Sequence, residues 1–115
     1  TLVAAATRVN IEAMQAREPE NPALAKYAIA GRLIGGNPKA SDVSARESLL
    51  GTLWEWTRLL NPPCLSALGV AEADFAPIVA HSRGSSMKTN PVALSDAEIE
   101  RILRLRLGGP GAHLT

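Results

Sequence analysis

The sequence predicts an all-α protein of about five helices in a compact bundle-like array. Its nineteen Ala and fifteen Leu outnumber six Val, six Ile and four aromatic residues. Ala and Leu are strong helix formers, whereas β-branched and aromatic residues suit a pleated sheet. Apolar side chains also recur at the helical spacings of three and four. Since 115 residues fit one domain, we expect residues 1–115 to form a single helical domain.

The first two helices are separated by a proline signal. The first covers Leu2 to about Gln15 and must end before Pro19. Asn21-Pro22 then restarts the helix, with Asn as cap and Pro in the first turn. The expected inward residues of the first helix are Leu2, Val3, Ala6, Val9, Ala13 and Ala16, and its polar face carries Arg8, Asn10 and Glu12.

The second helix ends at Gly35-Gly36-Asn37-Pro38 and contains Gly31, for which two interpretations are possible. Its inward side comprises Leu24, Tyr27, Ala28, Gly31 and Ile34. Gly31 either lets another backbone approach closely or is a tolerated glycine that costs about 1 kcal/mol relative to Ala.

The third helix is the longest, and two starts compete for it. Ser44 with Glu47 can form a capping box, while Ser41 is an alternative cap. Its apolar stripe is Leu49, Leu53, Trp56 and Leu60, widened by Leu50 and Trp54. Because residues two apart point about 200° away from each other on a helix, either Trp54 or Trp56 must leave the core. Asn61-Pro62-Pro63 ends the helix.

Two further helices complete the chain. A helix over 71–82 turns Phe75, Ile78 and Val79 inward; Pro77 requires either a start near Asp74 or a kink. The last helix begins at Ser95, which forms a capping box with Glu98, while Leu94 and Ile99 form a hydrophobic staple. The glycine-rich segment from Gly108 ends it, and we expect residues 108–115 to be a flexible tail.

Composition excludes several functions. The twelve basic and eleven acidic residues nearly balance, so the chain has no excess of positive charge that would attract nucleic acid. No apolar run reaches the roughly 18 residues that span a bilayer. The lone Cys64 cannot form an internal disulfide, which favours the cytoplasm, and we expect it to be a small buried apolar residue. His81 and His113 lie too far apart for a metal-binding pair, and His81 is expected at the surface near a helix end.

The segment from Ser85 to Pro91 is the strongest candidate for a site. Its small hydroxyls, Met, Lys and Asn-Pro between two helices can be shaped against a ligand cleft, or can form an ordinary interhelix loop. This loop and the segment Asn21 to Ala28 resemble the corresponding parts of iron-containing alcohol dehydrogenases. Weaker similarity covers Asn10, Gly31-Arg32-Leu33, residues 65–70 and Glu72-Ala73-Asp74.

The resemblance implies the C-terminal part of a dehydroquinate-synthase-like helical domain. In the parent enzyme, an N-terminal domain would bind NAD(P), and upstream helices would bind iron or another divalent metal. Both would precede Thr1, so they are the expected partners; a homo-oligomer is also compatible with the sequence, and no membrane or nucleic-acid partner is expected. Thr1 in place of Met favours a segment of a larger polypeptide over a trimmed N-terminus.

The resemblance assigns no catalytic or metal-binding residue to this chain. Ser86, Met87 and Asn90 would line the substrate cleft, and Thr89 stands where the family usually has Gly. The implied function is that of a helical segment of a metal-dependent alcohol dehydrogenase, inert alone. The alternative is a stand-alone helical module for protein interaction or dimerisation.

Overall fold

The computed structural model describes residues 1–83 and 86–108, and this part is all helical. The prediction of an all-α protein is therefore confirmed, with five α-helices, three short 3-10 helices and no strand among the described residues. The α-helices are α1 (Val3–Arg17), α2 (Pro22–Gly35), α3 (Asp42–Leu60), α4 (Phe75–Ser82) and α5 (Asp96–Leu105). The 3-10 helices are η1 (Ser66–Leu68), η2 (Glu72–Asp74) and η3 (Ser86–Thr89). The predicted tail, apart from Gly108, and His113 lie outside the described residues.

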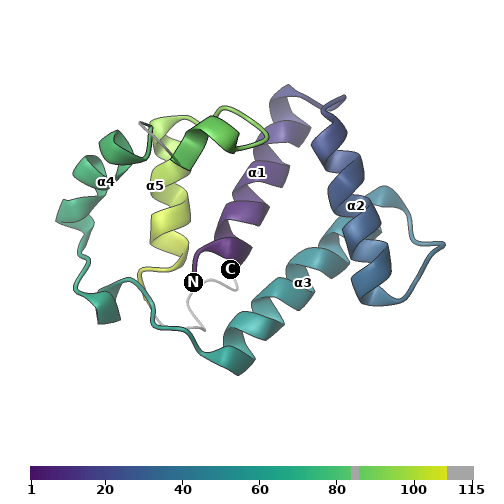
Figure 1. Cartoon of the computed structure of the whole chain (residues 1–115), viewed down its shortest axis with the longest axis horizontal. Helices are drawn as coiled ribbons and strands as arrows, with labels where there is room; N and C mark the ends of the chain where they lie inside the picture. Colours follow the sequence, from purple (N-terminus) through teal and green to yellow (C-terminus); the bar gives the residue numbers. More distant parts are fainter. Residues whose placement is uncertain (84–85, 109–115) are drawn as a thin grey trace.

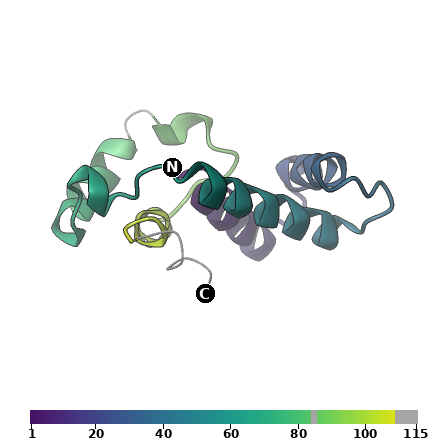
Figure 2. The ribbon, with the colours of Figure 1, turned by 90° about the horizontal axis from the view of Figure 1, so that it is seen from below.

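Helix α1 lies at the centre of a flat molecule. Helices α2 and α3 flank it on one side, α5 lies on the other, and α4 lies beyond α5 (Figure 1). The chain measures 44 × 31 × 22 Å, so its thinnest dimension is about two helix diameters (Figure 2). Because of this central position, α1 is buried on most of its circumference. Its buried residues are Ala4, Ala5, Thr7, Val9, Asn10, Ile11, Ala13 and Met14.

The predicted faces of α1 are only partly correct. Val9 and Ala13 are buried as expected, but Val3 is 59% exposed. Asn10, which was assigned to the polar face, is only 5% exposed. The spacing of apolar residues predicts a single buried side of a helix. Because neighbours cover α1 on several sides, this spacing could not predict that the side with Asn10 is also buried.

The packing of α2 on α3 resolves the role of Gly31. A Cβ atom added to Gly31 would lie 1.9 Å from the carbonyl oxygen of Ala45, which is far inside van der Waals contact. Gly31 is thus required for close approach of the two backbones. The Asn21 cap is confirmed, since its side chain accepts a hydrogen bond from the backbone N–H of Ala23. Ile34 was predicted to face inward and is instead 40% exposed.

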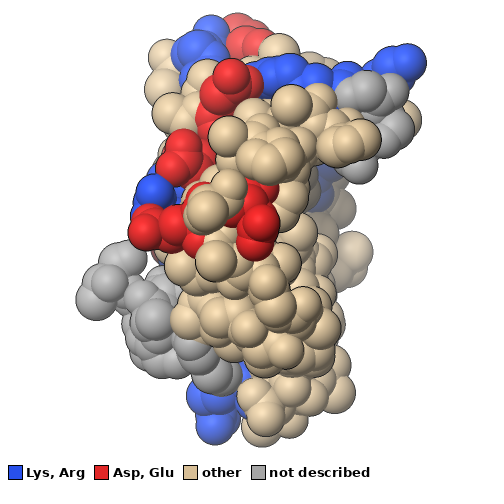
Figure 3. Space-filling view, turned by 90° about the vertical axis from the view of Figure 1, so that its left-hand side faces the viewer, with Lys and Arg blue, Asp and Glu red and all other residues tan. Residues whose placement is uncertain are grey.

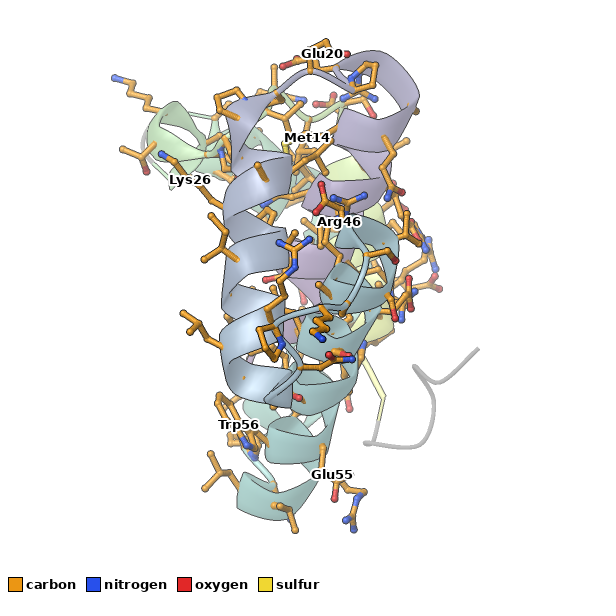
Figure 4. The ribbon with its side chains drawn as sticks, turned by 90° about the vertical axis from the view of Figure 1, so that its right-hand side faces the viewer. Met14, Glu20, Lys26, Arg46, Glu55 and Trp56 are labelled. Carbon is orange, nitrogen blue, oxygen red and sulfur yellow. The ribbon has the colours of Figure 1, made fainter. Side chains whose placement is uncertain are left out.

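Helix α3 begins at the earlier of its two candidate caps. The Ser41 side chain accepts a hydrogen bond from the backbone N–H of Ser44 at 3.2 Å, so the Ser44 capping box is wrong. As expected, the two tryptophans separate: Trp54 is 7% exposed and Trp56 is 47% exposed. The predicted apolar stripe fails at the end of the helix, where Leu60 is 81% exposed. Figure 4 shows Trp56 beyond the end of α2, where α2 no longer covers α3.

The last two helices follow their local signals closely. Helix α4 starts at Phe75, so Pro77 lies in its first turn and no kink is needed. The residues before it form the 3-10 helix η2 rather than the start of one helix over 71–82. The Ser95 and Glu98 capping box is present, and both members of the predicted staple, Leu94 and Ile99, are buried. None of the described helices is long and apolar enough to cross a membrane.

An ion pair joins the end of α1 to the start of α5. Arg17 donates to both carboxylate oxygens of Glu98, at 2.7 and 3.0 Å, and to the carbonyl oxygen of Ala93 at 2.8 Å. The hydrogen bonds from Arg17 are the main cause that lowers the pKa of Glu98 to about 2. Bidentate geometry of this kind is the strongest form of Arg–carboxylate contact.

Replacing Glu98 with Gln is expected to lower the unfolding free energy at pH 7 by about 1–2 kcal/mol, after allowance for the exposure of Arg17. The pKa of Glu98 is lower in the folded than in the unfolded chain. Its contribution is therefore fully present above the ordinary glutamate pKa and is lost as the pH falls towards 2. Urea unfolding of the wild type and Glu98→Gln across this range measures the difference. The exposed Glu47→Gln is the control, and an equal effect in both variants would contradict the assignment.

Candidate functional site

The candidate loop consists of η3 and the residues that connect it to α5. Met87 is half-buried and packs against the hydrophobic core, whereas Lys88 and Thr89 are exposed. Ser86 begins η3, and its side chain lies outside the described part of the chain. Among the described non-glycine residues only Asn61 has a positive φ. Thr89 therefore stands in this loop without the left-handed backbone that would require glycine.

A pair of asparagine side chains joins the loop to α1. The Asn90 amide nitrogen donates to Asn10 Oδ1 at 2.8 Å, and the Asn10 amide nitrogen donates to Asn90 Oδ1 at 3.0 Å. The Asn90 nitrogen also donates to the carbonyl oxygen of Val92 at 2.7 Å. Both N–H groups of the Asn90 amide are thereby engaged. The pair links residues 80 positions apart and lies against a nearly fully buried Asn10.

The chain after Asn90 is held at three successive carbonyl groups. Asn21 donates to the carbonyl oxygen of Pro91 at 3.0 Å, Asn90 to that of Val92, and Arg17 to that of Ala93. Asn21 also caps α2 through its other side-chain atom, so one residue joins two elements. The side chain of Val92 is itself buried. The loop therefore leaves η3 on a fixed path to α5.

The structure turns two of the three predicted cleft residues towards the protein interior. Met87 contacts the core and Asn90 is occupied by its pairing with Asn10. The exposed side chains of the described loop are those of Lys88 and Thr89. Sequence reasoning placed Asn10 on a solvated face and missed its role. The signal available in the sequence was the position of the Asn10 amide directly between two apolar residues, Val9 and Ile11.

A pocket of about 320 Å³ lies between α4 and α5, close to the loop in sequence but lined by other residues. Its lining consists of Ala76, Val79, Ala80, Arg83, Asp96 and Glu100. Arg83 pairs with Asp96 at 2.6 Å and donates to the carbonyl oxygen of Leu94. Acidic side chains gather on this side of the molecule (Figure 3). Within residues 1–83 and 86–108, no three His, Cys, Asp or Glu side chains are grouped to hold a metal ion.

Cys64 departs from its predicted environment. It is only partly buried, because it lies in the irregular segment between α3 and η1 rather than in the core. Its sulfur lies 3.3 Å from Ser66 Oγ. This hydrogen bond, followed by one from the backbone of Ala67, lowers the pKa of the thiol. His81 is exposed on the last turn of α4, as predicted.

The described geometry thus provides a braced loop. Three asparagines from α1, the start of α2 and the loop converge on residues 90–92. Comparisons with protein-family models, with curated proteins and with solved structures find no match to this chain.

Proposed function

We propose that this chain is the C-terminal helical segment of a metal-dependent, NAD(P)-linked alcohol dehydrogenase, in which it shapes the substrate side of the cleft. The observation that supports this proposal most is the meeting of Asn10, Asn21 and Asn90 around one loop. These residues come from three separate segments of the resemblance to iron-containing alcohol dehydrogenases. The proposal includes the finer fold assignment, a partial dehydroquinate-synthase-like helical domain.

The role of the chain in this proposal is to hold the loop. The Asn10 and Asn90 amides fix the end of η3, and Met87 anchors the loop in the core. Lys88 and Thr89 are then presented outwards between two residues, Met87 and Asn90, that contact the rest of the chain. Such pre-organisation positions a substrate without the loop residues taking part in bond making. Ser86 is proposed to face the same cleft.

The remaining chemistry belongs to the proposed parent enzyme. Its N-terminal domain would bind NAD(P), and its upstream helices would hold iron or another divalent metal. A bound metal of this kind polarises the oxygen of the alcohol, and the nicotinamide accepts the hydride. No described residue of this chain is assigned to either group.

The isolated chain is expected to show neither turnover nor stoichiometric metal binding. The measurement is an assay with NAD(H), Fe²⁺ or Zn²⁺ and short alcohols or aldehydes, together with calorimetric metal titration. Turnover, or tight binding of one metal ion per chain, would contradict the proposal. A second test reads the codons upstream of Thr1. The proposal requires them to continue in frame into a glycine-rich dinucleotide-binding domain.

A second candidate function is a stand-alone helical module for protein interaction or dimerisation. It is favoured by the exposure of Trp56 and Leu60, which are 47% and 81% exposed at the end of α3. Large apolar side chains that gather on a surface commonly mark an interaction site. This candidate predicts an open reading frame that does not extend into a nucleotide-binding domain.

A further inference from the structure

One side of α3 is covered along its first half and open along its second. The apolar stripe of this side starts with Ala45 and Leu49, which are 0% and 5% exposed. It continues about two and three turns after Leu49 with Trp56 and Leu60. Gly31 and Gly35 of α2 approach Ala45 and Ser48. Because α2 ends at Gly35, the last turns of α3 extend past it (Figure 4).

This open part of α3 borders an apolar groove. The groove has a volume of about 180 Å³ and is lined by Thr1, Val3, Leu53, Trp56, Thr57, Leu60 and Pro62. None of these side chains carries a charge. We refer to Val3, Leu53, Trp56, Leu60 and Pro62 as the open α3 face. The open α3 face has both a groove and the protruding side chains of Trp56 and Leu60. The protruding side chains of one copy could therefore enter the groove of another.

We propose that a second copy of this chain covers the open α3 face, with the two α3 helices packed antiparallel across a two-fold axis. An antiparallel crossing level with residue 58 sets the exposed Trp56 opposite the partner's exposed Leu60. Each contact then occurs twice, as two-fold symmetry requires. Large residues face smaller ones, which lets the two surfaces interdigitate.

The charges near the open α3 face and its exposed apolar area favour a second copy of this chain over a charged partner. Like charges that oppose each other disfavour contact between two identical faces. No side chain of the groove lining carries a charge, and the α-ammonium group of Thr1 is the charge that lies beside it. The charged pair Glu55 and Arg58 lies on α3 but outside the groove lining. The exposed parts of Val3, Trp56, Leu60 and the neighbouring Leu59 amount to roughly 400 Å² of apolar surface. This is about what the apolar centre of a standard interface contributes from each partner.

The face also continues an interface that the chain already uses. The same stripe of α3 packs against Gly31 of α2 at Ala45, so this side of the helix already makes one helix–helix contact. A second copy would extend this packing by two turns. The inference concerns the 115-residue chain by itself and rests on the second candidate function, dimerisation, which it makes specific.

The test is sedimentation velocity of the full chain over a range of concentrations. The wild type is expected to form a dimer. Leu60→Glu is expected to weaken the dimer by at least about 100-fold in dissociation constant, because the substitution occurs twice in a symmetric interface. Leu60 is 81% exposed in one copy, so the monomer should retain its far-ultraviolet circular dichroism. Leu68→Glu is the matched control, since Leu68 is 60% exposed on η1 and outside the open α3 face.

Three results would overturn the inference. One is a wild type that stays monomeric up to its solubility limit, and another is a dimer that Leu60→Glu leaves intact. The third is an equal loss of dimer in the Leu60 and Leu68 variants. None of these outcomes bears on metal binding, turnover or the upstream reading frame, so the proposed function is tested separately.

Discussion

Gly31→Ala is expected to lower the unfolding free energy by about 3 kcal/mol or more. The new methyl group would meet the carbonyl oxygen of Ala45 at 1.9 Å and its carbonyl carbon at 2.6 Å. Both atoms belong to the backbone of α3, so no side chain can rotate away to make room. The two helices must move apart, and overpacking of this kind usually costs 1–3 kcal/mol and occasionally more. Chemical denaturation of the wild type and the variant measures the loss.

Gly51→Ala provides the opposite control on the neighbouring helix. A Cβ atom at Gly51 meets nothing within 4 Å, and the residue lies inside α3 and is exposed. Ala should therefore stabilise the chain by about 0.5–1 kcal/mol through helix propensity. Opposite signs for the two substitutions are the expected result. A Gly31→Ala variant as stable as the wild type would show that α2 and α3 do not pack as closely as described.

Asn10→Ala is expected to lower the unfolding free energy by about 2 kcal/mol, because it leaves the Asn90 amide in a partly buried position without its partner. Asn90→Ala should have a similar effect. If the two amides act as one unit, the double variant will lose less than the sum of the single losses, with a coupling of about 1 kcal/mol. The three variants and the wild type form a double-mutant cycle measured by denaturation.

Hydrogen exchange provides the readout that links this pair to the loop. In both Asn variants, the backbone amides of residues 86–90 and of Val92 should exchange faster relative to those of α3, since the loop loses its attachment to α1. Thr89→Ala is the control, because Thr89 is exposed within the same loop. Additive losses, or unchanged exchange in the loop, would mean that the Asn pair does not hold the candidate site in place.

Local signals in the sequence predicted where most elements begin and end. Asn21-Pro22 and Ser95 cap the expected helices, and Pro77 lies in a first turn because it cannot occupy a later one. Each of these effects involves atoms within a few residues along the chain. The start of α3 shows the limit of such signals. Ser41 and Ser44 both satisfy a capping pattern, and the structure uses Ser41.

The candidate loop was located from the sequence, but the residues that brace it were only partly identified. Asn90 and Asn21 belonged to recognisable segments, whereas Asn10 was assigned to solvent. Its burial depends on α1 being covered by several neighbours, which only the arrangement of the helices establishes. The same cause explains Val3, Ile34 and Leu60, which are apolar residues on sides of helices that no neighbour covers.

The sequence by itself determined the helical class, most of the helix boundaries and the separation of Trp54 from Trp56, because these follow from residue preferences and from the period of a single helix. The tertiary structure decided that Gly31 permits a backbone contact, that Asn10 pairs with Asn90 and that the end of α3 remains open. These features depend on where one helix ends relative to another. A helical period specifies which residues share a side, but the partner that covers that side comes from elsewhere in the chain.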